Sequence, residues 1–205
     1  MPYWPEHTSM TDEELVRLCQ RSVAERDSAF TALVVRYQKR IYLAARKMVR
    51  GDHDEADEIA QETFVKAYQA LASFRGDSQF YTWLYRIMMN GVIQRSRRKS
   101  IREFVRIDDM DSAPPSEDIA PDQGLIGSET TRLLEEAIEL LPPKQRRVFL
   151  MRFYDELPYE EIAKIVGTSV GGLKANYFHA VRKIGEHLKA SGQIRPEFLA
   201  EAPSD

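Results

Sequence analysis

Apolar residues recur at steps of three and four along most of the chain, which is the spacing of amphipathic α-helices. No stretch alternates apolar and polar residues for long enough to predict a strand. Near the start, Thr11 is followed three positions later by Glu14, a pair that predicts a capped helix beginning at Thr11. The pattern therefore predicts an all-α protein.

Three long helical patterns occupy the first half of the chain, over residues 30–48, 54–72 and 80–98. The second is predicted to expose an acidic strip made of Glu58, Gln61, Glu62 and Val65. The third is predicted to turn Phe80, Leu84, Ile87 and Gly91 inward and Thr82, Arg86, Asn90 and Arg97 outward. Trp83 lies at the border, and the pattern leaves open whether it is a core residue or a stacking platform for a base.

The second half of the chain predicts a helix-turn-helix. An apolar stripe ends at Pro142-Pro143, and a helix follows over residues 144–154. A short helix over residues 160–166 is then separated by the turn 167–169 from a longer helix that starts at Val170. Two helices joined by a short glycine-containing turn are typical of DNA-binding proteins of this class.

Charge is segregated along the chain, although the net charge is only −3. Residues 81–106 contain seven bases and one acid, whereas residues 107–129 contain seven acids, three prolines, two glycines and no base. The acidic segment is typical of a linker. We therefore expect two helical domains, with these boundaries: domain 10–100, linker 101–128, domain 129–190, and a tail 191–205 to which we assign no role.

Several functional classes are disfavoured by what the sequence lacks. No apolar run of about 18 residues and no signal-peptide pattern occur, and Cys19 is the single cysteine, so we expect a cytoplasmic protein without disulfides. Residues 54–57 read DEAD, but no G-K-[ST] sequence is present to hold a nucleotide. His53 and Asp57 could suggest a metal site, although acids at a helix start are favoured by the helix dipole alone. We expect no catalytic residue, metal or cofactor.

Residues 74–99, FRGDSQFYTWLYRIMMNGVIQRSRRK, combine five aromatic rings with a basic end. Packing explains part of the aromatic content, but it does not explain the cluster Arg95, Arg97, Arg98 and Lys99. Basic side chains bind phosphates, and aromatic rings can stack on unpaired bases. This stretch therefore predicts a site that opens duplex DNA and holds one strand.

Three separated motifs of the chain resemble the extracytoplasmic-function (ECF) sigma factors of bacterial RNA polymerase. They are DHDEADEIAQETFVKAYQAL, FRGDSQFYTWLYRIMMN with its following bases, and LPPKQRRVFLMRFYDELPYEEIAKIVGTSVGGLK. The resemblance covers about residues 28–188. It implies a promoter-melting domain (sigma region 2), a linker that threads toward the RNA exit path of the polymerase, and a helix-turn-helix domain (sigma region 4).

The resemblance also implies partners and site residues. Core RNA polymerase is expected to bind Asp54, Asp57, Glu58, Gln61, Glu62 and Val65. The minus-ten promoter element, whose non-template strand would donate a flipped base, is expected at Phe74, Arg75, Asp77, Ser78, Gln79, Phe80, Tyr81, Arg86, Asn90, Arg95, Arg97, Arg98 and Lys99. The minus-35 element is expected at Ser169, Gly171, Gly172, Lys174, Ala175, Asn176, Phe178, His179 and Arg182. An anti-sigma factor is a further partner that the family implies.

One departure from the family pattern concerns the recognition helix. Members commonly have a sequence like GTV[KR]SR, whereas this chain has GGLKAN, with Ala175 and Asn176 in place of Ser and Arg. Asn can pair with adenine through two hydrogen bonds, so Asn176 predicts an altered base preference. Two alternatives to the sigma interpretation are a stand-alone helix-turn-helix regulator and a metal-dependent nuclease built on the acidic run.

Overall fold

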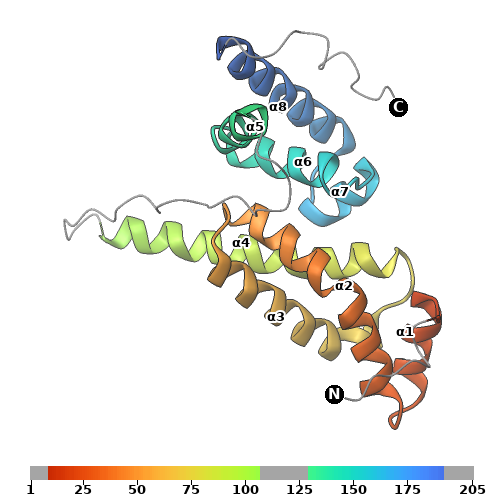
Figure 1. Cartoon of the computed structure of the whole chain (residues 1–205). Coiled ribbons are helices and arrows are strands. Elements are labelled where there is room, and N and C mark those ends of the chain that lie inside the picture. The colour runs from red at the N-terminus through yellow and green to blue at the C-terminus, as the bar shows by residue number, and fades with distance from the viewer. Residues whose placement is uncertain (1–8, 107–128, 192–205) are drawn as a thin grey trace. The chain divides into compact units, whose positions relative to one another are not determined.

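A computed structural model describes residues 9–106 and 129–191 (Figure 1). Every regular element in those two ranges is a helix, which confirms the all-α prediction. The chain divides into two compact units, one within residues 1–115 and the other within residues 116–205. The exact domain boundaries proposed from the sequence stay a prediction.

Unit 1 contains four α-helices and one short 3-10 helix. Their bounds are α1 Asp12–Arg21, α2 Arg26–Met48, α3 His53–Ala70, the 3-10 helix η2 Leu71–Ser73, and α4 Phe80–Arg106. Helix α2 packs against α1, α3 and α4, and α3 also packs against α4. The core between them contains the fully buried side chains Leu15, Leu33, Ile41, Ile59, Leu84, Tyr85, Met88 and Met89.

Local sequence signals set the helix starts in unit 1. The Thr11 hydroxyl accepts a hydrogen bond from the Glu14 amide at 3.3 Å, and the Glu14 carboxylate accepts one from the Thr11 amide at 2.7 Å, which confirms the predicted capping box. Asp52 caps α3 by accepting from the Glu55 amide at 2.9 Å. The acids that follow Asp52 therefore lie in the first turn of a helix, where the dipole stabilises them.

Unit 2 is formed by α5 Glu129–Glu139, α6 Pro143–Phe153, α7 Tyr159–Val166 and α8 Val170–Ala190. Helix α8 packs against α5, α6 and α7. Gly167 ends α7 with φ of 66°, a left-handed conformation that glycine adopts without a steric penalty. The Ser169 hydroxyl then caps α8 by accepting from the Gly172 amide at 3.3 Å. The predicted helix-turn-helix is present.

Two sequence expectations about α4 were wrong. The helix continues through Arg106, eight residues beyond the predicted helix end at Arg98. No proline or glycine interrupts this segment, and bases near a helix C-terminus are favoured by its dipole. Thr82, expected to face outward, is only 6% exposed, because the first turns of α4 are covered on several sides.

Candidate nucleic-acid interface

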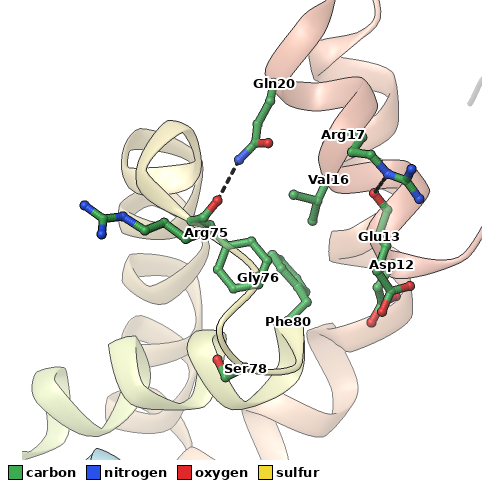
Figure 2. A pocket seen from close by; sticks show the side chains of 10 residues that line it. Asp12, Glu13, Val16, Arg17, Gln20, Arg75, Gly76, Ser78 and Phe80 are labelled. Carbon is green, nitrogen blue, oxygen red and sulfur yellow. Dashed lines mark hydrogen bonds between the residues drawn. The ribbon is translucent and has the colours of Figure 1, made fainter.

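A pocket of about 160 Å³ lies between α1 and the loop that joins η2 to α4 (Figure 2). Helix α1 contributes one wall and the loop contributes the other. The residues that line it are Asp12, Glu13, Val16, Arg17 and Gln20 from α1, and Phe74, Arg75, Gly76, Ser78 and Phe80 from the loop and the start of α4. Gly76 has φ of 79°, so the loop turns at a position where a side chain would be strained.

Aromatic rings form the base of this pocket. Phe74, Phe80 and Trp83 make a cluster with centroid separations of 5.0 to 5.8 Å. Trp83 is only 7% exposed, so it is a core residue that supports the two phenylalanines. Tyr81 is buried away from the pocket lining, stacked on Tyr37 at 5.7 Å. Of the predicted aromatic base contacts, the structure therefore brings Phe74 and Phe80 to the pocket but not Tyr81.

The remaining loop residues differ in position. Arg75 and Ser78 line the pocket, but the Arg75 guanidinium points away from α1 (Figure 2). Asp77 and Gln79 are exposed in the same loop but do not line the pocket.

Asp12 ties the α1 wall to α2. Its two carboxylate oxygens accept hydrogen bonds from Arg36 and from the Tyr37 hydroxyl. Arg36 also donates to the Met10 carbonyl at 2.7 Å. Burial, followed by the hydrogen bond to Asp12, raises the pKa of the Tyr37 phenol, so Tyr37 stays a neutral donor at physiological pH. The N-terminal end of α1 is thereby fixed to the core.

A polar and basic face follows the pocket along α4. Arg86, Asn90, Arg97 and Arg98 are all exposed. Arg86, Asn90 and Arg97 are spaced by four and seven residues, so they lie on one side of the helix. Lys99 belongs to the same helix, but its side chain lies outside the described residues. This face can contact successive phosphates of a strand whose base occupies the pocket.

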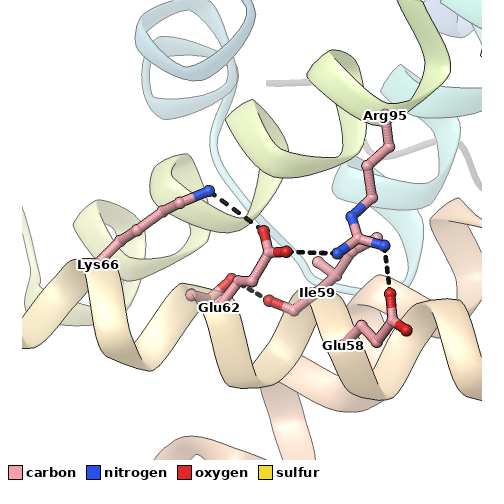
Figure 3. Close-up of polar contacts among 6 residues, drawn as sticks. Glu58, Ile59, Glu62, Lys66 and Arg95 are labelled. Carbon is pink, nitrogen blue, oxygen red and sulfur yellow. Dashed lines mark hydrogen bonds and ion pairs between the residues drawn. The ribbon is translucent and has the colours of Figure 1, made fainter. Parts of the chain in front are cut away.

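Arg95 differs from its neighbours because it is paired inside unit 1 (Figure 3). Its Nη1 lies 2.7 Å from Glu58 Oε2, and its Nη2 lies 2.5 Å from Glu62 Oε1. These bonds, with that to Glu58 foremost, raise the pKa of Arg95. Partial burial acts to raise the pKa of Glu62, but its bonds to Arg95 and Lys66 outweigh this and hold it below the ordinary value. Arg95, which was predicted to contact DNA, is thus bonded to Glu58 and Glu62, which were predicted to contact core RNA polymerase.

The predicted polymerase-binding residues of α3 form one exposed strip. Asp54, Asp57, Glu58, Gln61, Glu62 and Val65 are all exposed. Gln61 donates to Asp57 Oδ2 at 2.9 Å, and Lys66 lies 3.3 Å from Glu62. Val65 is 57% exposed at the edge of this acidic strip, which gives it an apolar contact point. Such a strip suits a partner with a basic surface.

In unit 2, the predicted DNA-reading residues lie on the outer side of α8 and in the turn before it. Ser169, Gly171, Lys174, Ala175, Phe178, His179 and Arg182 are exposed, and Gly172 is half-buried. Phe178 is 63% exposed, which is unusual for a large apolar ring. Asn176 is half-buried, and its Nδ2 donates to the Gly172 carbonyl at 2.8 Å. Its amide is therefore engaged within α8.

Both units match family models. The Sigma-70 region 2 model matches residues 33–101, and the Sigma-70 region 4 model matches residues 131–184. The ECF RNA polymerase sigma-E factor of Escherichia coli strain K12 is 36% identical over 188 residues, covering 88% of this chain and 95% of that protein. The chain belongs to the ECF sigma factors. This sigma factor therefore acts in promoter-specific transcription initiation, a non-catalytic role.

Further relatives and solved structures are similar to this chain. The RNA polymerase sigma-H factor of Pseudomonas aeruginosa is 34% identical over 189 residues, covering 89% of this chain and 96% of that protein. Among solved structures, the sigma factor RpoE of Bartonella quintana, in complex with the anti-sigma factor NepR, matches with a TM-score of 0.66 and 26% identity, covering 78% of this chain and 96% of that one. CnrH in complex with the cytosolic domain of CnrY matches in fold, with a TM-score of 0.60.

The α1 wall of the pocket was missed by sequence reasoning. Asp12, Glu13, Val16, Arg17 and Gln20 fall before residue 33, where the region 2 match begins. The capping box identified the helix, but no local signal places it beside a loop more than 50 residues later.

Within the described parts of the chain, no group of three His, Cys, Asp or Glu side chains could hold a metal ion, and no helix is long and apolar enough to span a membrane.

Proposed function

We propose that unit 1 captures one unstacked base of the non-template strand at the minus-ten element in the pocket between α1 and the loop. The supporting observation is that Phe74 and Phe80 line a pocket from which a face of exposed polar and basic residues continues along the same helix. Stacking on aromatic rings stabilises an unpaired base by about 1 to 3 kcal/mol. The Ser78 hydroxyl, in the pocket lining, supplies a donor and an acceptor for the base edge, and the Arg75 guanidinium, on the side of the loop away from α1, contacts the adjoining strand.

The α4 face holds the adjoining strand. Arg86, Arg97 and Arg98 are exposed cations that contact phosphates, and Asn90 adds a neutral donor and acceptor between them. Arg95 acts differently, because its guanidinium links α4 to Glu58 and Glu62 of the acidic strip of α3 and its charge is compensated within unit 1. Tyr81 supports the site from the core, where the Arg40 guanidinium lies 3.6 Å from its ring centroid.

The acidic strip of α3 docks on a basic surface of core RNA polymerase. Glu58 and Glu62 supply charge, Gln61 supplies hydrogen bonds, and Val65 supplies an apolar contact. Docking anchors the sigma factor while strand separation proceeds, so a small protein need not bind the melted promoter by itself.

Helix α8 reads the minus-35 element in the major groove. Lys174 and Arg182 contact phosphates or guanine edges, while Ala175 and Phe178 offer apolar contacts to thymine methyl groups. Ser169, Gly171 and Gly172 bring the N-terminus of α8 close to the DNA backbone, where the helix dipole favours a phosphate. His179 stands beside Phe178 at a ring separation of 5.7 Å and extends this surface.

Run-off transcription tests the proposal. Purified core polymerase is incubated with fragmented genomic DNA, with and without the sigma factor, and specific transcripts are expected only in its presence. An electrophoretic assay with the recovered promoters should show specific binding only when core polymerase is added. Specific binding by the chain alone, without stimulation of transcription, would instead establish the stand-alone regulator.

The sigma factor is expected to have an anti-sigma partner and to act in the cytoplasm. The solved RpoE structure described above was determined with the anti-sigma factor NepR, and we expect such a partner to cover the polymerase-binding surfaces of this chain. Because core polymerase is its target, the sigma factor acts in the cytoplasm. The acidic segment that we expect to thread toward the RNA exit path, residues 107–128, and the C-terminal tail from residue 192 lie outside the described residues.

A further inference from the structure

The side chain of Gln20 connects α1 to the turn that precedes the loop. Its Nε2 donates to the Leu71 carbonyl at 2.9 Å and to the Phe74 carbonyl at 2.9 Å. Figure 2 draws the second of these bonds. Leu71 is the first residue of η2, and Phe74 is the residue that follows η2 and starts the loop. One amide group therefore holds both ends of the turn from which the loop departs.

The chemistry of this contact fixes its orientation. A glutamine amide carries two N–H donors on its nitrogen and only acceptor sites on its oxygen. Both partners of Gln20 are carbonyl oxygens, so only the nitrogen can face them. The Phe74 amide also donates to the Leu71 carbonyl, at 3.1 Å, so this carbonyl accepts from both the turn and α1. Without Gln20, only the bond within the turn would remain.

Gln20 also belongs to the stripe of α1 that forms the pocket wall. Residues Glu13, Val16 and Gln20 recur at steps of three and four, so they share one face of the helix. Asp12, at the start of this stripe, is fixed to α2 through Arg36 and Tyr37. The wall is consequently tied to the core at its beginning and to the loop at its end.

We propose that Gln20 is a positioning residue that keeps the loop at the separation from α1 that an unstacked DNA base requires. The inference rests on the proposed base capture and adds to it a role for α1. Because the loop turns at a glycine, which has no side chain to anchor it, the position of the loop depends on contacts made at its ends. Loss of the Gln20 amide would let the Phe74 end move away from Val16 and Arg17.

The test uses holoenzyme assembled from core polymerase and the full-length chain. Wild-type holoenzyme first selects its preferred strand from a degenerate single-stranded DNA library. Variants of that strand then carry an abasic site at each position in turn. The wild type should show one position at which removal of the base weakens binding by about tenfold, because the stacked base is lost.

The informative variant is Gln20→Met, which keeps the length of the side chain and removes both donors. Its abasic penalty at the sensitive position should fall below about twofold, while core binding and the thermal unfolding midpoint stay within error. Gln38→Met, the same change at an exposed position of α2, is the matched control and should keep the tenfold penalty. Retention of the full penalty in Gln20→Met would overturn the positioning role.

Two further outcomes separate this inference from the proposed function. Equal weakening of every strand by Gln20→Met, together with a lower unfolding midpoint, would show a general structural role and overturn the inference while leaving base capture intact. No sensitive position in the wild type would overturn base capture itself, and the inference with it.

Discussion

The guanidinium of Arg95 lies 2.5 Å from the carboxylate of Glu62, and it reaches Glu58 with its other terminal nitrogen. The side chain of Arg95 is 22% exposed, so water and ions screen this cluster only in part. The two carboxylates belong to the α3 strip proposed to bind polymerase, whereas Arg95 comes from the helix proposed to bind DNA. The two surfaces are therefore in direct electrostatic contact within unit 1.

Replacement of Arg95 by Ala should affect polymerase binding more than DNA binding. Two carboxylates already compensate the charge of Arg95, so the salt slope of promoter binding by holoenzyme should change by less than about half a unit. The uncovered Glu58 and Glu62 should bind core polymerase about two- to fivefold more tightly at low salt. Titrations of labelled sigma factor with core polymerase over a range of salt measure this. A fall of about one unit in the promoter slope would show that Arg95 leaves the carboxylates for a phosphate.

Arg97→Ala and Arg98→Ala should each weaken open-complex formation. Both side chains are exposed cations, and each lost phosphate contact lowers the slope of log K against log salt by about one. Filter binding of holoenzyme to promoter DNA at several salt concentrations provides the slopes. Lys39→Ala removes the same charge from the exposed surface of α2 and serves as the control, with an expected slope equal to that of the wild type. Unchanged slopes in the arginine variants would remove the phosphate contacts.

The Asn176 amide should contribute little to base readout. One N–H of its Nδ2 donates to the Gly172 carbonyl and the side chain is half-buried, so the amide is held against α8 and its reach to a base edge is restricted. We expect Asn176→Ala to change the relative affinity for any single base of the minus-35 element by less than about threefold, below the usual effect of losing a two-bond contact. A selection of randomised minus-35 sequences with variant holoenzyme measures this preference. Loss of an adenine preference in the variant would show that the Asn176 amide contacts an adenine edge.

Gly167→Ala should destabilise unit 2 by about 1 kcal/mol, because the left-handed φ of 66° strains a residue with a Cβ. Gly171→Ala is the matched control, since at both positions an added Cβ would meet nothing within 4 Å, and only Gly167 has a positive φ. The control should be neutral or slightly stabilising in a helix. Urea unfolding followed by circular dichroism, with hydrogen exchange to assign the change to unit 2, gives both values. Equal effects would exclude backbone strain as the cause.

Cys19 should be unreactive in the folded protein. Burial raises the pKa of its thiol to about 11, and the thiolate is the nucleophile. Iodoacetamide at pH 8 should therefore modify the native chain about 100-fold more slowly than the urea-unfolded chain. Because the unfolded chain loses this proton first, the folded state should also lose stability as the pH rises between about 9 and 11. Equal labelling rates for the native and unfolded chains would refute the burial argument.

Sequence reasoning succeeded where the determining contacts are local. The capping box of Thr11 and Glu14 spans four residues, and Gly167 marks its turn by residue type alone. The apolar stripes likewise predicted which faces of the helices are buried. Such features depend on helix geometry, which repeats every three to four residues.

The misses are contacts between residues far apart in the chain. Gln20 and Leu71 are 51 residues apart, and Arg95 and Glu58 are 37 apart, so no periodicity relates them. Thr82 was misplaced because its burial depends on packing around the start of α4, which a single-helix projection does not include. In unit 2, the buried Arg146 forms an ion pair with Glu139 at 2.6 Å. The sequence shows only that a charged residue lies within a helix, not that it is buried or which residue it pairs with.

The continuity of α4 from Phe80 to Arg98 has a consequence for promoter architecture. At about 1.5 Å per residue, Phe80 at the pocket and the exposed Arg98 are separated by roughly 27 Å of helix. For a strand that keeps the 3.4 Å rise of B-form DNA, this corresponds to about eight nucleotide steps. The length of the helix would thus set the distance between the captured base and the phosphate that contacts Arg98. An inserted or deleted nucleotide between these two points would shift the strand out of register.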